Sequence, residues 1–272
     1  MTSNSILSKN LLASEYMKHL NKYIEHTNIH PAAKKADILN LCFEAKKYQF
    51  RSVCVNPEWS MLCKEKLRDT GIKIVIVYNF PTSKSRETRF ADEIDLLVQA
   101  RGCSTKEGRK KLEKQLQEAK QLKFNTGLPI KIVIETHILI KKEIKLATKL
   151  ITKYKLDYVK SSTGLYNRIH KILSDRTKDP KGLQIIDKAY SKNNFEDLKY
   201  IKKGLNILGI IPRKFLFMYT PKIKIAGGIT YYKDAENLLQ LGSDLLGASK
   251  GIKMIIDQKA DKAIEEYKKK DK

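Results

Sequence analysis

The hydrophobic positions of this chain alternate between short apolar runs, rich in β-branched residues, and longer stretches with helical spacing. Short apolar runs bounded by turn residues predict buried strands, and apolar residues at three- and four-residue intervals predict amphipathic helices. The pattern therefore indicates eight strands separated by helices or loops. The predicted strands are 24–27, 52–55, 72–78, 93–98, 131–135, 157–160, 222–226 and 244–247.

Helical spacing occupies most of the intervals between these strands. We expect Pro31 to open one helix, because proline is favoured in the first turn, and Gly71 to stop the next. The predicted helices are 11–22, 31–45, 61–67, 106–123, 142–154, 195–208, 233–241 and a last one from about residue 250.

Eight strands that alternate with helices predict a parallel sheet, and this number of strands fits a closed barrel. The competing fold, an open doubly wound sheet, usually carries a glycine-rich turn after its first strand. Residues 24–31 contain no glycine. We therefore predict an α/β fold, a (β/α)8 TIM barrel that forms a single domain over residues 1–272.

Two intervals depart from the regular alternation. Only residues 82–92 lie between Pro81, just after the third strand, and the fourth strand. A whole βαβ crossover needs at least ~10–12 residues, so this unit is predicted to be shortened. Residues 165–221, rich in Lys, Asn and Asp, form a long insertion between the sixth and seventh strands. Within the insertion, residues 215–219 are expected to form an apolar strand or a packed loop. Such an insertion is expected on the loop face of a barrel.

The chain is strongly basic, with 54 Lys and Arg residues against 30 Asp and Glu and a formal net charge of +24. Such a charge can attract nucleic acid or an anionic membrane. Only 9 of the 54 basic residues are Arg, however, and they and the lysines are spread along the whole chain. Recognition of phosphates and bases usually uses Arg. We expect no dedicated nucleic-acid partner, although the charge would help to gather phosphorylated substrates.

Neither the cysteines nor the N-terminus indicates an exported protein. Cys42, Cys54, Cys63 and Cys103 form no CxxC pair and have no histidine at zinc-finger spacing, so we expect four reduced thiols, most of them buried. Residues 1–10 lack the apolar core of a signal peptide, and no run approaches the ~18 apolar residues of a membrane span. The sequence predicts a soluble, cytoplasmic protein with no membrane partner.

Two lysines stand out by their position along the chain. Lys160 ends the sixth predicted strand, and Lys224 lies within the seventh, just before Gly227 and Gly228. The C-terminal ends of barrel strands line the active site. A lysine that is desolvated there, close to another ammonium group, becomes a usable amine nucleophile. Position alone is equally compatible with two surface lysines at the rim.

The motifs around these lysines resemble those of the deoxyribose-phosphate aldolase family, the Schiff-base-forming class I aldolases of deoxynucleoside catabolism. The resemblance runs in order through nearly the whole chain, and its most specific motifs are DYVKSSTG and IKIAGG. It implies a TIM barrel that cleaves 2-deoxy-D-ribose 5-phosphate to D-glyceraldehyde 3-phosphate and acetaldehyde, without a metal or a cofactor. The matching segments are 24–31, 41–57, 79–81, 92–98, 131–136, 157–164, 223–230 and 246–249.

The resemblance also implies separate roles for individual residues. Lys160 matches the lysine that forms the Schiff base with acetaldehyde, and Lys224 matches the second lysine, which lowers the pKa of the first. Asp95 matches the acid that joins the second lysine in the proton relay. Cys54 matches a cysteine near the substrate in many relatives, although a buried small hydrophobic residue is the commoner role for such a thiol.

The substrate phosphate is expected beside the ends of the sixth, seventh and eighth strands, a position that barrels often use. Gly227 and Gly228 offer backbone N–H groups, and Ser249 begins a helix whose N-terminus favours an anion. The resemblance adds Thr163 and Gly164 to this substrate-binding set. Each glycine taken alone could equally serve a tight turn, and their joint placement favours the phosphate.

The chain departs from the family at the insertion, at the short 82–92 connection and at two motif positions. Ala226 replaces a serine, and Lys250 stands where a second serine is expected. None of these changes removes a catalytic group. The alternatives are another Schiff-base sugar-phosphate aldolase, or a barrel without catalysis that binds RNA or protein partners. A homodimer is possible, and the sequence leaves open whether Tyr267 reaches the site.

Overall fold

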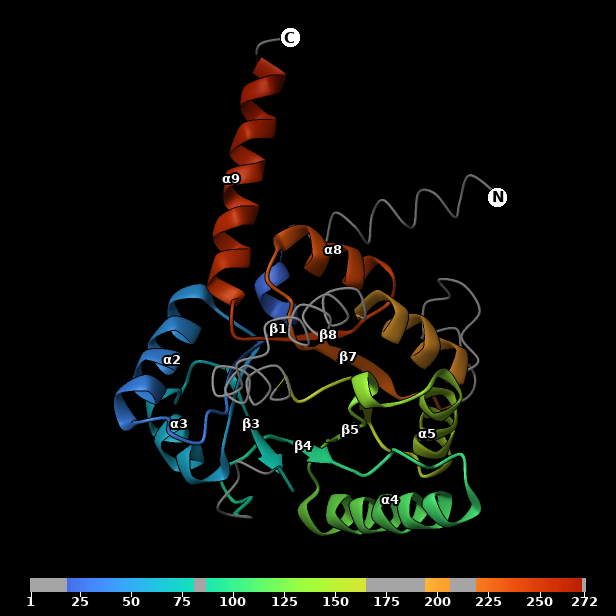
Figure 1. Ribbon diagram of the computed structural model, residues 1–272. Helices are drawn as coiled ribbons and strands as arrows, with labels where there is room; N and C mark the ends of the chain where they lie inside the picture. Colours follow the sequence, from blue (N-terminus) through green and yellow to red (C-terminus); the bar gives the residue numbers. More distant parts are fainter. Residues whose placement is uncertain (1–18, 81–86, 165–193, 206–218, 271–272) are drawn as a thin grey trace, which may run out of the picture.

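The fold is a closed barrel of eight parallel strands, which confirms the predicted architecture (Figure 1). The structure, a computed structural model, describes residues 19–80, 87–164, 194–205 and 219–270. Neighbouring strands follow the order of the sequence, and β8 pairs with β1 to close the sheet. The strands are β1 (Ile24–Asn28), β2 (Ser52–Val55), β3 (Lys73–Tyr78), β4 (Glu93–Leu97), β5 (Ile130–Val133), β6 (Tyr158–Lys160), β7 (Lys222–Ala226) and β8 (Leu245–Ala248).

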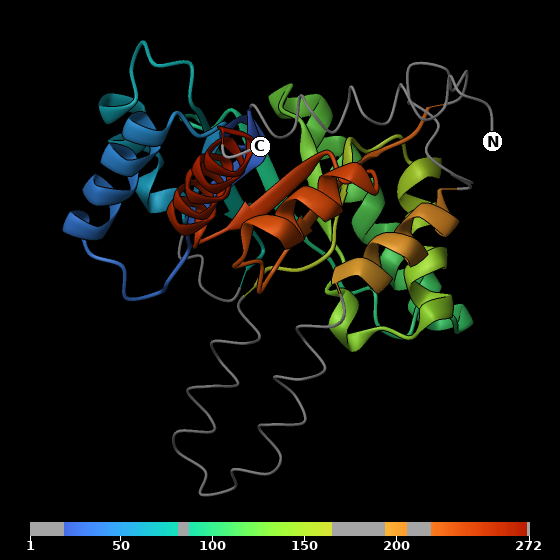
Figure 2. The same cartoon turned by 90° about the horizontal axis from the view of Figure 1, so that it is seen from above.

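Helices surround the barrel (Figures 1 and 2). The α-helices are α2 (Lys35–Tyr48), α3 (Ser60–Lys66), α4 (Lys106–Thr126), α5 (Lys141–Lys153), α8 (Tyr232–Gln240) and α9 (Gly251–Lys270). A further helix, residues 194–204, lies between β6 and β7 in the sequence and is called the insertion helix below. The described ranges also contain the short 3-10 helices η1 (Leu20–Tyr23), η2 (Pro57–Trp59) and η3 (Thr136–Ile138).

Alternation along the strands separates an apolar outer face from an inner face that carries charged side chains as well as a smaller apolar cluster. In β7, Ile223 and Ile225 are fully buried in the apolar core that the helices share. Lys224 lies between them and therefore points to the opposite face of the sheet. In β5, Ile130 and Ile132 flank Lys131 in the same way. The sequence period of two thus sends a charged side chain into the barrel from the middle of an apolar strand.

The chain turns at Pro31 instead of beginning a helix there. The Ala33 N–H donates to the His30 carbonyl at 3.0 Å, which closes a turn around Pro31, and α2 begins only at Lys35. The prediction of a helix start at Pro31 was wrong because the fixed φ of proline suits the second position of a turn as well as the first turn of a helix.

Most other boundaries agree with the predicted ones within two residues. The main part of the helix predicted at 11–22 lies outside the described residues, and Leu20–Tyr23 form a 3-10 helix. Helix α3 ends at Lys66, well before Gly71, which adopts a φ of 71° in the loop to β3. The end of the helix predicted at 195–208 and residues 215–218 also lie outside the described residues.

The outer ring of helices is thin at one place and supplemented at another. Between β3 and β4 the structure describes residues 79, 80 and 87–92, and they contain no helix, which agrees with the shortened unit predicted there. On the far side of the barrel, the insertion helix lies between α5 and α8 in both views (Figures 1 and 2). It buries Leu198 and Ile201 almost completely. The insertion thus supplies the helix that follows β6 in a regular barrel.

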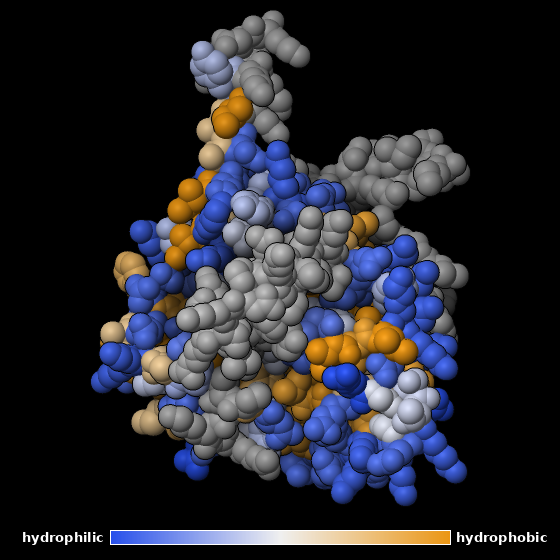
Figure 3. All heavy atoms as spheres, viewed as in Figure 1, coloured by the Kyte–Doolittle hydropathy of each residue, from blue (hydrophilic) through white to orange (hydrophobic). Residues whose placement is uncertain are grey.

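The visible surface is mostly hydrophilic (Figure 3), in keeping with the net charge of +24. Helix α9 extends away from the barrel (Figure 1) and carries exposed hydrophobic residues, among them Ile256 and Ile264, each 53% exposed. Within the described ranges, no helix has both the length and the apolar character needed to cross a membrane.

The packing of the insertion helix on α5 can be tested at Gly204. A Cβ atom at this residue would lie 2.7 Å from the Thr148 Cβ and 2.9 Å from the Lys145 carbonyl oxygen. We expect Gly204→Val to lower the free energy of unfolding, measured by denaturant titration, by about 1–3 kcal/mol, as overpacking does. Lys199→Val, at an exposed position of the same helix, should change it by less than about 0.5 kcal/mol. Equal effects of the two changes would contradict this packing.

Candidate active site

Charged side chains fill part of the barrel interior, where the strand alternation directs them. They come from β1, β4, β5, β6 and β7, and each is at most 2% exposed. Buried charges are tolerated only where they are paired and hydrogen-bonded. We call this set the interior charge network. Its members are Glu25, Glu93, Asp95, Lys131, Lys160 and Lys224.

Asp95 is the centre of the interior charge network. Its Oδ2 atom accepts hydrogen bonds from Lys160 Nζ at 2.6 Å and from Lys224 Nζ at 2.7 Å. Because one oxygen atom contacts both nitrogens, the two lysines lie within two hydrogen-bond lengths of each other. The strand register also brings the two lysines together, because Lys160 and Lys224 are direct partners in the β6–β7 ladder. The long insertion between them in the sequence therefore leaves the pair adjacent.

Glu25 and Lys131 extend the network away from the lysine pair. The Glu25 carboxylate contacts Lys224 Nζ through Oε1, and its Oε2 accepts from Lys131 Nζ at 3.0 Å. Lys131 Nζ also lies 3.4 Å from Asp95 Oδ1. The two carboxylates thus hold Lys131 and Lys224 in one hydrogen-bonded cluster. Sequence reasoning missed Glu25 and Lys131, although Lys131 is a charged residue inside an apolar strand. Glu25 lies in a strand of mostly polar residues, which gave no such signal.

Glu93 lies next to this cluster, and we call Glu93 and the basic residues around it, Lys131, Lys73 and Arg51, the second layer of charge. The Glu93 carboxylate lies 2.7 Å from Lys131 Nζ, 2.9 Å from Lys73 Nζ and 2.5 Å from an Arg51 guanidinium nitrogen. Burial alone raises the pKa of Glu93, but Lys131 and Arg51 outweigh burial and lower the pKa well below its usual value. Burial likewise opposes charge on Lys131, and Asp95 with Glu93 raises its pKa. Both groups are therefore charged at neutral pH.

In Lys224, burial determines the direction in which the pKa of the ammonium group shifts. Complete burial lowers the pKa of Lys224 well below the usual value for lysine, so this ammonium group releases its proton more readily than an exposed one. The β8 backbone approaches it closely. A Cβ atom at Gly247 would lie 3.1 Å from Lys224 Cε and 2.9 Å from Ala226 Cβ. Glycine at this position therefore leaves the space that Lys224 occupies.

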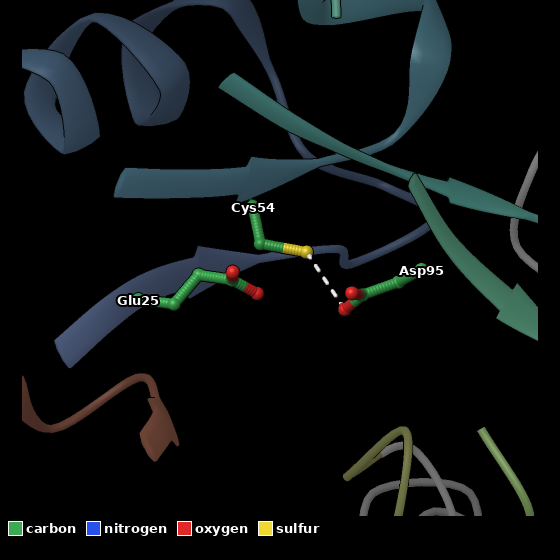
Figure 4. Close-up of side chains that lie close together, drawn as sticks. All are labelled: Glu25, Cys54 and Asp95. Atoms are coloured by element: carbon green, nitrogen blue, oxygen red, sulfur yellow. Dashed lines mark hydrogen bonds between the residues drawn. The ribbon is translucent and has the colours of Figure 1, made fainter. Parts of the chain in front are cut away.

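Cys54 lies beside the network on β2. Figure 4 shows its side chain and those of Glu25 and Asp95 directed toward one another, with their possible metal-ligand atoms within 4.8 Å. Burial and the nearby Asp95 raise the pKa of the Cys54 thiol to about 12, so the thiol is protonated at neutral pH and a poor metal ligand. Both carboxylates also contact lysine ammonium groups. We therefore assign this grouping to the charge network and not to a metal centre.

A cavity of about 270 Å³ opens at the C-terminal ends of β6, β7 and β8. Lys160 is the member of the charge network that lines it. Asp95, Lys224 and Cys54 are fully buried, and Lys160 links them to the cavity through its contact with Asp95. The cavity thus brings together six of the nine residues that the sequence singled out, namely Lys160, Thr163, Gly164, Gly227, Gly228 and Ser249.

The backbone N–H groups around the cavity differ in what they bind. The N–H groups of Thr163 and Gly164 are already engaged, because they donate to Glu135 Oε1 at 2.5 Å and to Ser162 Oγ at 3.0 Å. Three others donate to no acceptor in the described part of the chain, and they belong to Gly227, Gly228 and Ser249. Beside Ser249, α9 begins at Gly251, with the unpaired first-turn N–H groups of a helix N-terminus.

Tyr267 is not one of the residues that line the cavity. It lies in α9, the helix that extends away from the barrel (Figure 1), and its side chain is 68% exposed. The four cysteines, in agreement with the sequence, carry free and buried thiols.

Comparison with known proteins indicates one family, although no family model matches the sequence. A deoxyribose-phosphate aldolase of Mesomycoplasma hyopneumoniae (strain J) is 33% identical over 249 residues, an alignment that covers 87% of this chain and 95% of the relative. One of Acholeplasma laidlawii is 31% identical over 253 residues and covers 89% and 97%. The tetrameric deoxyribose phosphate aldolase of Aeropyrum pernix has a TM-score of 0.67 at 20% identity, covering 97% of this chain and 100% of that chain. This structure shares the barrel fold.

The second layer of charge makes stability depend on pH. The pKa of the Glu93 carboxyl group is lower in the folded chain than in the unfolded one, where it is near 4.5. The carboxylate therefore contributes its full share to the free energy of unfolding above about pH 4.5. This share is lost as the pH falls toward the folded pKa. We expect Glu93→Gln to lower the free energy of unfolding at pH 7 by about 3–5 kcal/mol and to flatten its decline below about pH 5. Denaturant titrations at several pH values measure both effects.

The control for this experiment is Glu107→Gln. Glu107 pairs with Lys111 on the surface, where its side chain is 78% exposed, and salt screens such pairs. The substitution should leave both the stability at pH 7 and its pH profile close to those of the wild type. A Glu93→Gln protein with the wild-type acid profile would contradict the role assigned to the second layer.

Proposed function

The chain belongs to the deoxyribose-phosphate aldolase family, and we propose that it cleaves 2-deoxy-D-ribose 5-phosphate to D-glyceraldehyde 3-phosphate and acetaldehyde through a Schiff base on Lys160. The observation that carries this proposal is the contact of Lys160 and Lys224 with one oxygen atom of Asp95. Of these three residues, Lys160 lines the cavity. A substrate in the cavity can thus reach the proposed nucleophile, Lys160. The two residues proposed to exchange protons with it, Asp95 and Lys224, are buried.

The reaction begins when the Lys160 amine attacks the aldehyde carbon of the open-chain sugar. The ammonium group must first lose a proton, and the Asp95 carboxylate, which contacts Nζ at 2.6 Å, is placed to accept it. Loss of water from the adduct leaves an iminium ion. Its positive nitrogen withdraws electrons from the adjacent carbon, so the enzyme needs no metal to stabilise the carbanion that cleavage creates.

Cleavage follows when the C3 hydroxyl group loses its proton and the C2–C3 bond breaks. D-glyceraldehyde 3-phosphate leaves, and the electron pair of the bond forms an enamine on the two-carbon fragment. A proton then returns to C2, and water releases acetaldehyde from Lys160. Asp95 and Lys224 carry this proton traffic in the proposal, because burial lowers the pKa of Lys224 and the two groups share a hydrogen bond.

The phosphate of the substrate binds, in this proposal, at the end of the cavity formed by Gly227, Gly228 and Ser249. Their N–H groups donate to no acceptor in the described residues, and α9 begins beside them with the positive end of its dipole. Lys250 also lines the cavity and adds a positive charge. Thr163 and Gly164 line the cavity next to Gly227, and their backbone N–H groups are already used.

The decisive experiment combines borohydride trapping with a retro-aldol assay. Acetaldehyde and borohydride should label Lys160 in the wild type, as peptide mass spectrometry detects. Lys160→Leu should lose both the label and the cleavage of 2-deoxy-D-ribose 5-phosphate. Lys224→Leu should lower kcat by on the order of 10²- to 10⁴-fold, the usual effect of losing an acid–base group. A chelator should leave the wild-type rate unchanged.

Lys222→Leu is the matched control for the lysine variants. Lys222 lies two residues before Lys224 on the same strand but is exposed, so its loss should leave kcat within about twofold of the wild type, as expected for a surface substitution. Undiminished turnover in Lys160→Leu, or turnover abolished by a chelator, would refute the Schiff-base mechanism.

A further inference from the structure

Glu135, in the loop that follows β5, has an unusual backbone conformation. It lies two residues after the end of this strand, with a φ of 53° and a ψ of 62°. This left-handed region is unfavourable for a residue with a long side chain, and such strain persists only where surrounding contacts stabilise it. The Glu135 carbonyl accepts the Ile138 N–H at 3.1 Å, and the remaining contacts described below are those of its carboxylate.

Both oxygen atoms of this carboxylate bind the loop that follows Lys160. Oε1 accepts the Thr163 N–H at 2.5 Å, and Oε2 accepts the Ser162 hydroxyl at 3.3 Å. His137 Nδ1 also lies 3.0 Å from Oε2. Burial by itself raises the pKa of Glu135, but His137 and Thr163 outweigh burial and lower the pKa below its usual value. The carboxylate is therefore charged at neutral pH.

The Glu135 contacts determine the shape of one wall of the cavity. Gly164 is held indirectly, because its N–H donates to Ser162 Oγ at 3.0 Å and this hydroxyl donates to Glu135. Thr163 and Gly164 line the cavity, whereas Glu135 does not. A single buried carboxylate thus orients the 162–164 loop without facing the substrate.

The 162–164 loop also faces the glycines proposed to bind phosphate. A Cβ atom at Gly164 would lie 3.6 Å from the Cα of Gly227, so the two glycines are direct neighbours in the cavity lining. A shift of the loop would therefore move the surface next to the proposed phosphate site. The Lys160 side chain is held separately, through Asp95, and its backbone is held by the strand ladder. None of these contacts involves the Glu135 carboxylate.

We propose that Glu135 is a positioning residue that holds the 162–164 loop as one wall of the phosphate end of the cavity, so that it supports binding of the phosphorylated substrate but not Schiff-base formation. This inference rests on the proposed function, since it assumes that the cavity binds the sugar phosphate. It adds to that function a residue that the sequence did not single out and that touches neither the nucleophile nor the substrate.

The test separates substrate binding from the chemistry at Lys160. Glu135→Ala should raise KM for 2-deoxy-D-ribose 5-phosphate, and Ki for inorganic phosphate as a competitive inhibitor, by about tenfold or more, as expected for the loss of a charge-assisted hydrogen bond. The rate of borohydride trapping with acetaldehyde, which has no phosphate, should stay within about twofold of the wild type, since Lys160 keeps its contacts. Glu135→Gln, whose amide oxygen still accepts the Thr163 N–H, should recover most of the affinity.

Glu143→Ala is the matched control. Glu143 is also a buried glutamate that accepts backbone N–H groups, from Gly102 at 2.7 Å and from Ile140 at 3.2 Å, but it does not line the cavity. Its loss should lower stability without changing KM. If Glu135→Ala fails to fold, Glu135→Gly provides the same test, because glycine adopts a positive φ without strain.

Three results would overturn the proposal. They are an unchanged KM in Glu135→Ala, an equal rise of KM in Glu143→Ala, and a loss of acetaldehyde trapping in Glu135→Ala. Failure of the proposed function looks different, because the wild-type protein would then show no trapping at Lys160 at all.

Discussion

The contact of three lysines with the Asp95 carboxylate is the interaction on which the rest of the structure depends. Lys131, Lys160 and Lys224 are almost completely buried, and ammonium groups are stable there only beside negative charge. Asp95 meets all three. These contacts stabilise the charged lysines in the core, and they also place Lys160 and Lys224 around one oxygen atom of Asp95. The same ion pairs therefore serve both folding and the proposed catalysis.

The remaining charges of the network form ion pairs with the lysines around Asp95. Glu93 joins Lys131 to Arg51 near the start of the strands, and Glu25 joins Lys131 to Lys224. Removing one member of such a network leaves its partner charged and buried, which costs more than the pair contributes. The barrel interior is therefore rigid in its charge arrangement, and a rigid arrangement favours catalysis because donors and acceptors need no rearrangement during the reaction.

The cavity, in contrast, is built from loops, and elements far apart in the sequence position them. Glu135 holds the loop after β6, and Asn194 of the insertion helix donates from its side chain to the Gly227 carbonyl at 2.9 Å. A peptide unit is planar, so fixing the Gly227 carbonyl also fixes the direction of the following N–H group, that of Gly228. The insertion helix therefore helps to position a lining residue of the cavity as well as completing the outer ring.

The sequence by itself determined the eight strands and the positions of Lys160, Lys224 and Asp95, because the two-residue alternation and short motifs are local properties. It did not indicate Glu25, Lys131 or Glu135 as parts of the site. Glu25 is 199 residues from Lys224 and 106 from Lys131, and they meet only because the barrel closes. The local sequence also left the structure at Pro31 undecided, because the fixed φ of proline is compatible with both a turn and a helix start. Charge pairing and loop geometry were decided by tertiary structure, because both depend on distances that no local pattern encodes.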